Sequence, residues 1–555
     1  MKHATLVACV FLSMSAPAQA AWLHLCPAVA APAGAPQAAL PGPGAMRAVV
    51  AGVAELAGCR GVPLGTGAAQ VEAIYPLPAA DVPGSVILLQ GVAGERFAPN
   101  SHTLPVPGAP APAPAPMPLN TNLLAAASVR AFGREERVRV EHGEAGLQLS
   151  CRAGMRAAGV LVTGPWYLPR AQLAVRARFS GDGAFRVQVA DTQDAAREHA
   201  HDLGKLGAVS GKSTLAMPMP AGLDRARWRQ FVIQCPPHAA SLVLDSLALE
   251  PVPGSPGRRA TWIWEAARWQ AGGALLDWAG REGIGELFIV VPLQEGRVRE
   301  PAALAAFVQR AHAAGISVSS VDGDPHMVLP EQHGATIRRA RAYAAYNASA
   351  APEARLRAIQ FDIEPYLLPA NTIAPPEADR QYMALARALR RAAGKTTLEF
   401  VVPYWWSEKP ELLAALAGAA DGLAVMDYRT DPDEIVRFGV PFLDWAAHHG
   451  KRVHIALEAG PVAPETQRRY VRAPSGEAGS LVVAEAGGHR ILVLLRAPAA
   501  VPGAAVYRLE GERVFDGSAT SFHGDQARLR DLLPRLERDF SAWPGFAGVA
   551  LHEWR

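Results

Sequence analysis

The sequence predicts a multidomain protein whose C-terminal part is a (β/α)8 TIM barrel, preceded by a β-sandwich and a small N-terminal region. Strand-like and helical segments alternate regularly from residue 258 to 555, whereas residues 120–253 carry only short strand-like runs. A Pro/Ala-rich segment at 105–119 precedes them. The 555 residues exceed the size of one ordinary domain, and half of them are hydrophobic, which suffices for several cores.

Residues 1–20 are predicted to be a secretory signal peptide. A basic start at Lys2 is followed by an apolar stretch and by "AQA" ending at Ala20, a small-residue cleavage site. The apolar run is too short for a stable membrane span. "LVAC", ending at Cys9, resembles a lipoprotein box but lies very early. We therefore expect a periplasmic or secreted protein, and a net charge of only +3 does not indicate a nucleic-acid partner.

Four cysteines remain after the predicted cleavage, an even number that suits disulfides in an exported protein. Order along the chain favours the pairs Cys26–Cys59 and Cys151–Cys235, each within one predicted domain. Four unpaired buried thiols are the alternative. Since no CxxC motif or Cys/His cluster is present, the sequence predicts no metal site and no cofactor.

The chain divides at the Pro/Ala-rich segment. Residues 21–104 form a small region with strand-like pieces such as "QVEAIYPL", and no function is assigned to it. Alternating Pro and Ala at 105–119 favour an extended, semi-rigid linker. The evenly spaced short runs of 120–253 are typical of a β-sandwich, either a carbohydrate-binding module or a packing domain.

Eight strands separated by amphipathic helices predict the barrel. The expected strands are 261–264, 286–291, 316–322, 358–364, 397–405, 422–428, 452–458 and 546–554. The helical stretches at 300–315 and 377–394 each end in Gly, a common helix terminator. About residues 459–523 form an insertion before the last strand, with hairpin-like strands. We expect this insertion to shape or cover the site.

Two carboxylates follow the fourth strand, in "AIQFDIEPYLLP", and barrel enzymes keep their reactive groups at this end of the strands. Asp362 and Glu364 are two residues apart, so both side chains should point into the barrel. Because two close carboxylates cannot both ionise easily, one pKa should be raised, which suits a general acid near neutral pH.

The other strand ends add polar and aromatic side chains. Glu458 ends the seventh strand as a candidate nucleophile or base. The predicted substrate-binding residues are Trp262, Trp264, Asp322, Asp324, Tyr404, Trp405, Asp427, Tyr428, His552 and Glu553. Acids interleaved with aromatic rings fit a sugar site. The alternatives are a structural ion pair for Glu364, and a turn or a weak metal site for "DGDPH", which contains Asp322 and Asp324.

The fourth and sixth strands resemble glycoside hydrolase family 18, whose fourth strand ends D-x-x-D-x-D-x-E. "RAIQFDIE" matches its last two acids, with Arg357 and Gln360 in place of the first two, and "VMDYR" is similar to its Met-x-Tyr strand. The resemblance implies that Glu364 is the acid. It also implies that Asp362 assists a substrate N-acetyl group, although the two departures put that role in doubt.

A second resemblance is to barrel hydrolases with acids on strands four and seven, which implies Glu364 as acid/base and Glu458 as nucleophile. Ile363 stands where that group has Asn. Carboxyl groups roughly 5–5.5 Å apart would imply retention, and roughly 6.5–9.5 Å inversion. The segment 261–554 also looks like a group of bacterial barrel proteins sharing "DIEPYLLP", which supports the fold more than any reaction.

We therefore expect an exported glycoside hydrolase that cleaves a polysaccharide, such as an exopolysaccharide or cell-wall glycan, by carboxylate acid/base catalysis. The alternative is a non-catalytic glycan-binding protein with a degenerate hydrolase barrel, suggested by Arg357 and Gln360. A third hypothesis is the hydrolysis of another polymer by deacetylation or amide cleavage. Metal-dependent deacetylation would need ligands that only "DGDPH" offers.

Overall fold

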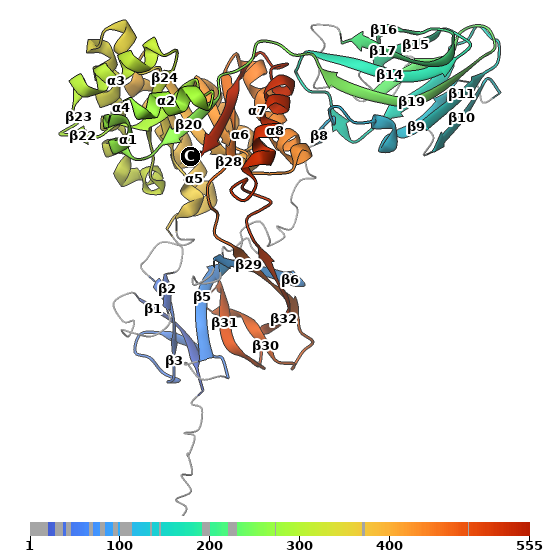
Figure 1. Ribbon diagram of the computed structural model, residues 1–555. Helices are drawn as coiled ribbons and strands as arrows, with labels where there is room; N and C mark the ends of the chain where they lie inside the picture. The colour runs from blue at the N-terminus through green and yellow to red at the C-terminus, as the bar shows by residue number, and fades with distance from the viewer. Residues whose placement is uncertain are drawn as a thin grey trace, which may run out of the picture. The chain divides into compact units, whose positions relative to one another are not determined.

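The computed structural model contains strands, an α/β barrel and connecting loops (Figure 1). The structure describes residues 20–27, 37–39, 46–65, 70–77, 84–92, 98–99, 114–133, 136–143, 146–190, 200–219, 230–271, 273–368, 372–486 and 488–554. The predicted signal peptide, apart from residue 20, and most of the predicted linker lie outside these residues. Contacts divide the chain into two units, one of which joins the N-terminal region to residues 463–516.

The first unit is built from two antiparallel sheets. The smaller has the order β2-β3-β1-β4 and the larger β5-β31-β30-β32-β29-β6-β7. The strands are β1 (Trp22–Pro27), β2 (Gln37–Ala39), β3 (Met46–Ala51), β4 (Arg60–Pro63), β5 (Val71–Leu77), β6 (Val86–Val92), β7 (Ala98–Pro99), β29 (Glu465–Arg472), β30 (Gly479–Ala486), β31 (His489–Ala499) and β32 (Ala505–Phe515). The N-terminal region and the predicted insertion thus share one sheet, a pairing that the sequence analysis did not predict.

The disulfide Cys26–Cys59 lies in this unit and confirms the predicted pair. A buried apolar cluster joins the two sheets, with Leu23 and Val50 from the smaller sheet and Val482 and Val493 from the larger. Both halves of the cluster contribute side chains from alternate positions of their strands, as a sheet with one buried face requires.

The second unit contains the predicted β-sandwich. Its sheets have the orders β10-β11-β19-β14-β17 and β16-β15-β18-β12-β9. The strands are β9 (Ser128–Phe132), β10 (Val138–Gly143), β11 (Gly146–Cys151), β12 (Gly159–Thr163), β14 (Leu173–Gly181), β15 (Phe185–Ala190), β16 (Ala200–Leu206), β17 (Val209–Pro218), β18 (Gln230–Gln234) and β19 (Ala240–Pro251). The short β8 (Ala115–Pro116) and β13 (Trp166–Tyr167) pair separately.

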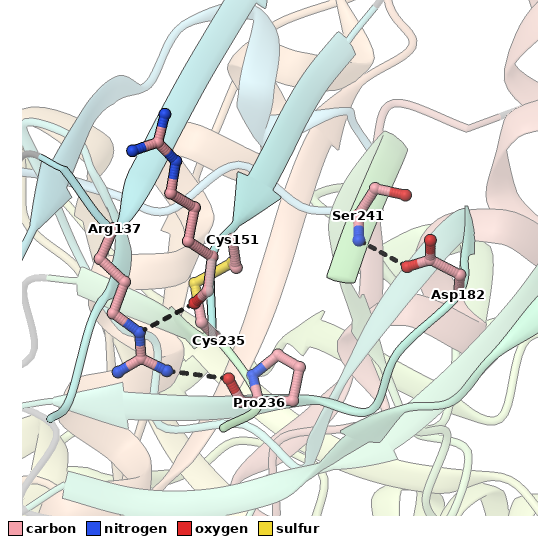
Figure 2. The surroundings of a disulfide bond; sticks show 7 residues. Arg137, Cys151, Asp182, Cys235, Pro236 and Ser241 are labelled. Atoms are coloured by element: carbon pink, nitrogen blue, oxygen red, sulfur yellow. Dashed lines mark hydrogen bonds between the residues drawn. A yellow bond between two sulfur atoms is a disulfide. The ribbon is translucent and has the colours of Figure 1, made fainter. Parts of the chain in front are cut away.

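The second predicted disulfide, Cys151–Cys235, connects the end of β11 to the residue after β18, and therefore crosses from one sheet to the other. Figure 2 shows the guanidinium of Arg137 beside this bond. Its Nη2 donates to the carbonyl of Pro236 at 2.9 Å and its Nε to the carbonyl of Arg152 at 3.2 Å. The same side chain thus fixes the backbone on both sides of the bridge.

The barrel is closed, with the strand order β20-β21-β24-β25-β26-β27-β28-β33, and it confirms the predicted fold class. Its strands are β20 (Ala260–Ile263), β21 (Glu286–Val290), β24 (Ser317–Asp322), β25 (Ala358–Asp362), β26 (Thr397–Pro403), β27 (Gly422–Met426), β28 (Arg452–Glu458) and β33 (Phe546–His552). The helices are α1 (Ala266–Gln270), α2 (Ala274–Arg281), α3 (Pro301–Ala313), α4 (Pro330–Ser349), α5 (Pro375–Ala393), α6 (Pro410–Ala419), α7 (Pro432–His449) and α8 (Gln526–Phe540).

Side chains fill the barrel in layers, as in a packed core. The middle of the barrel holds Trp262, Phe288, Val321 and Val401, all buried. Nearer the N-terminal ends of the strands lie four ionisable groups, Glu286, Arg357, Glu399 and His454. The polar groups at the C-terminal end form the candidate site. In the part of the chain that the structure describes, no helix has the length and apolar character needed to span a membrane.

Candidate functional site

A cavity of about 250 Å³ opens at the C-terminal end of the barrel strands. Its lining consists of Trp264, Gly323, Asp324, Pro325, Asp362, Glu364, Met426, Tyr428 and His552. Six of these are residues that the sequence predicted for the site, and they come from strand ends far apart in the chain. The volume suits part of a sugar chain rather than a whole polymer, so a glycan would extend beyond it.

The two central carboxyl groups are placed by the end of β25. Asp362 is the last residue of the strand, and Glu364 immediately precedes the short 3-10 helix η7 (Pro365–Leu367). The segment that follows β24 lies very close to Asp362, because a Cβ on Gly323 would collide with the Asp362 carbonyl group. Only glycine therefore permits this packing beside the acid pair.

The pKa values of both carboxyl groups are raised. Burial, and then the charge of Glu364, raise the pKa of Asp362 to about 7, while His552 opposes this shift. Its buried Oδ1 has no hydrogen-bond partner among the described residues, which further disfavours a negative charge. Burial also raises the pKa of Glu364. The pair can therefore retain a proton near neutral pH, as a general acid requires.

Tyr366 is a member of the site that the sequence analysis missed. Its hydroxyl donates a hydrogen bond to Oε2 of Glu364, and its ring packs edge-on against Trp405 with centroids 5.0 Å apart. The turn of η7 brings Tyr366 back over the acid two residues before it. The signal was present in "EPY", because Pro365 starts a tight turn, but residue spacing alone does not reveal which way the ring points.

The predicted nucleophile, Glu458, does not line the cavity. It is buried, and both of its oxygens accept hydrogen bonds: Oε1 from the Gly460 amide at 2.6 Å and Oε2 from His552 Nδ1 at 2.7 Å. His552 stands at the cavity wall in its place. In this structure the Glu458 carboxyl group therefore contacts the imidazole of His552 and not the cavity.

Two other predicted residues lie below or beside the cavity. Trp262 is buried in the barrel, where its indole N–H donates to Gln360 Oε1 at 2.8 Å. Asp322 is buried and forms an ion pair with Arg339, and it accepts a hydrogen bond from the Tyr343 hydroxyl at 2.8 Å. Both side chains are therefore occupied by the fold, because β24 and β20 use these positions for packing.

The remaining predicted residues do not line the cavity. Tyr404 accepts a hydrogen bond from Arg429, and Trp405 packs against the Tyr366 ring. Asp427 is fully buried behind β27, where Gly439 of α7 faces it, and its burial raises its pKa well above the usual range. Glu553 packs against Gly460.

Asp324 lines the cavity but also completes a local turn, as the alternative for "DGDPH" proposed. Its Oδ1 accepts from the backbone N–H of His326 at 2.7 Å and from the His326 ring at 2.8 Å. The residues that the structure describes contain no group of three or more His, Cys, Asp or Glu side chains placed to hold a metal ion.

The raised pKa of Asp362 predicts a pH-dependent stability difference. In the unfolded chain the pKa of this carboxyl is near 3.8, and in the folded chain it is near 7. Between these values the folded state binds more protons, so the free energy of unfolding is highest below about pH 4 and falls as the pH rises to about 7. Asp362→Asn removes that loss. We expect the variant to be about 2 kcal/mol more stable than the wild type at about pH 7.5 and to lose this advantage near pH 4.

Urea denaturation followed by tryptophan fluorescence at several pH values measures this difference. Glu411→Gln, at an exposed position in the first turn of α6, is the matched control and should follow the wild type throughout. A stability difference that does not change with pH would mean that Asp362 is ionised in the folded protein.

Comparison with known proteins places the chain in no family. No family profile matches it, and no curated protein matches it. Among solved structures, the CBM22-1–GH10 modules of Clostridium thermocellum xylanase 10B with xylohexaose match at 9% identity and a TM-score of 0.26, covering 62% of this chain and 81% of theirs. A variant of Cellvibrio japonicus xylanase 10C with xylopentaose matches at 10% identity and a TM-score of 0.27, covering 60% and 79%.

A family 29 carbohydrate-binding module covers 22% of this chain and 75% of its own, at 10% identity and a TM-score of 0.19. At such TM-scores none of these similarities carries an argument about this protein. The fold is established by its own strand order, and the function has to be argued from the residues of the cavity.

Proposed function

We propose that this protein is an exported glycoside hydrolase that cleaves a polysaccharide with Glu364 as the general acid. The observation that carries the proposal is the pair Asp362 and Glu364, two neighbouring carboxyl groups with raised pKa values in a cavity at the C-terminal end of a (β/α)8 barrel. A protonated carboxyl group facing a cavity can donate its proton to the leaving oxygen of a glycosidic bond.

Four of the lining residues have a role in such a reaction. Glu364 protonates the glycosidic oxygen as the bond to the anomeric carbon breaks. Asp362 can share the proton of the pair with Glu364, and in its ionised form it can stabilise the positive charge that develops on the sugar ring. Tyr428 and Trp264 offer ring faces at which a pyranose can be positioned. Export is supported by the two disulfides, which persist in oxidising compartments.

A non-catalytic glycan-binding protein is the second candidate. It is favoured by Arg357 and Gln360, which stand where family 18 hydrolases carry acids and which bind other barrel residues here. In that case the cavity would bind a sugar chain without cleaving it. The proton on Asp362 and Glu364 would then serve as a hydrogen-bond donor to a hydroxyl or carbonyl group.

A panel of polysaccharides separates the two candidates. The wild type should release reducing ends from at least one glycan, and the double variant Asp362→Asn/Glu364→Gln should release none while still binding that glycan. Glu411→Gln should act as the wild type does. Binding of a glycan without release by the wild type would support the binding protein, and release that persists in the double variant would remove the acid pair from the reaction.

A further inference from the structure

His552 is the basic group of the cavity, and its orientation is fixed on both sides. Its Nδ1 lies 2.7 Å from Glu458 Oε2, and Glu458 is in turn held by the Gly460 amide. Gly460 cannot be replaced easily, because a Cβ there would approach Glu553 and Glu458. The carboxylate therefore serves to hold the imidazole and to stabilise it when it gains a proton.

The second ring nitrogen of His552 is capped by Trp264. The indole N–H has no lone pair to offer and can only donate, so its 3.0 Å contact with Nε2 requires an unprotonated Nε2. His552 is thus neutral in this arrangement, with its proton on Nδ1 toward Glu458. The ring of Tyr428 lies nearly parallel to the imidazole, with centroids 6.0 Å apart and an interplanar angle of 23°.

Trp264 can leave this contact, because it is 37% exposed and lies at the mouth of the cavity. Glu458 is buried and cannot move in the same way. A sugar ring that stacks on Trp264 would draw the indole away from His552. The accepting lone pair of Nε2 would then face the cavity, which also holds Asp362 and Glu364.

We propose that His552 is a further catalytic residue, the base that takes a proton from the attacking water, with Glu458 as its positioning residue and Trp264 as a cap that substrate displaces. This inference rests on the proposed glycosidase function. The water oxygen bonds to the anomeric carbon and its proton passes to Nε2, while the bond to the leaving oxygen breaks and that oxygen takes the proton of Glu364. Transfer of the proton from His552 to Glu364 through solvent restores the site.

The groups around His552 suit this role. The acidic groups are Glu458 from β28, Asp362 at the end of β25, Glu364 just after that strand, and the adjacent Glu553, and Tyr428 follows β27. The negative charges of Glu458 and Glu553 favour the protonated imidazole that the reaction would form. Since the water and not a protein carboxylate attacks the sugar, the product should have the inverted anomeric configuration.

Two variants and one control test the proposal by kinetics. His552→Gln should lower kcat about 10²–10⁴-fold. Glu458→Gln should lower kcat less, and should also move the acidic limb of the pH–rate profile to lower pH, because the imidazolium loses its anionic partner. His448→Gln, at an exposed position in the last turn of α7, should match the wild type. A merely structural role of Glu458 would lower kcat without moving the limb.

A titration without substrate tests the histidine independently of the glycosidase proposal. Protonation of Nε2 must break its hydrogen bond with the Trp264 indole. The difference in tryptophan fluorescence between the wild type and Trp264→Phe should therefore change with pH in a single transition. It should shift to lower pH in Glu458→Gln and vanish in His552→Gln. If no glycan is cleaved but this transition appears, the glycosidase proposal fails, whereas the interaction of His552 with Glu458 and Trp264 is supported.

Three results would overturn the proposal that His552 is the base. They are a His552→Gln variant with kcat within about threefold of the wild type and an unchanged pH profile, product with retained configuration, and a fluorescence difference that is independent of Glu458. Circular dichroism of each variant shows that a loss of rate does not reflect unfolding.

Discussion

Glu364→Gln is expected to lower kcat on the cleaved glycan by about 10³-fold, with little change in KM. The glutamine side chain has nearly the same shape and can still accept the hydrogen bond from Tyr366, but it has no proton to give to the leaving oxygen. Initial rates of reducing-end release give both constants. The isosteric control Glu411→Gln should change neither, since that side chain is exposed on α6.

The same variant should also change the pH dependence of its neighbour. The charge of Glu364 raises the pKa of Asp362, so its removal should lower that pKa. The residual activity of Glu364→Gln would then lose the decline above about pH 7 that the shared proton imposes on the wild type. A variant that keeps the wild-type rate and profile would contradict the assignment of Glu364 as the acid.

Arg357→Met is expected to produce the largest loss of stability, about 3–5 kcal/mol at neutral pH. Arg357 donates two hydrogen bonds to Glu399, at 2.8 and 2.7 Å, and a third to Glu286. Both carboxylates are almost completely buried, and burial raises the pKa of Glu286 to about 7 even beside the arginine. Without Arg357, two buried acids would face each other with no cation between them.

His454 supplies no charge to these acids in the wild type. Its side chain is buried, and its Nε2 lies 3.8 Å from Oε2 of Glu286. Burial lowers the pKa of His454 to about 3, so the imidazole is neutral. The penalty in Arg357→Met should therefore shrink toward about pH 4, where the acids take up protons. Urea denaturation of the variant at several pH values measures this.

A compensated variant separates charge from packing. Arg357→Met/Glu286→Gln/Glu399→Gln should recover much of the loss, because no unpaired charge remains in the barrel. Arg338→Met, on the exposed side of α4, should change stability by less than about 0.5 kcal/mol. Equal losses in the single and triple variants would mean that the stem of Arg357, and not its charge, stabilises the barrel.

The barrel and its acid pair could be predicted because both depend on local patterns. Eight strand-like runs separated by amphipathic segments leave few other folds, and a strand end places Asp362 and Glu364 on one face without knowledge of their neighbours. The disulfides could be predicted because each pair closes within a single domain. These inferences need only the order of residues along the chain.

The rest depends on contacts between distant segments. Glu458 points inward as the strand pattern predicts, yet His552 of β33 stands between it and the cavity. Asp322 ends a strand as Asp362 does, but Arg339 of α4 pairs with it. The pairing of β6 with β29, more than 370 residues later, makes one sheet from two regions that look independent in sequence. No local pattern specifies these partners.

Two substrates of Glu364→Gln show directly whether Glu364 donates the proton. A dinitrophenyl glycoside of the cleaved sugar has a leaving group that departs without a proton, whereas the natural glycan needs one. If Glu364 donates the proton, the variant should lose about 10³-fold in kcat on the glycan but less than about tenfold on the dinitrophenyl glycoside. Equal losses on both substrates would show that Glu364 supports the structure of the site and does not donate the proton.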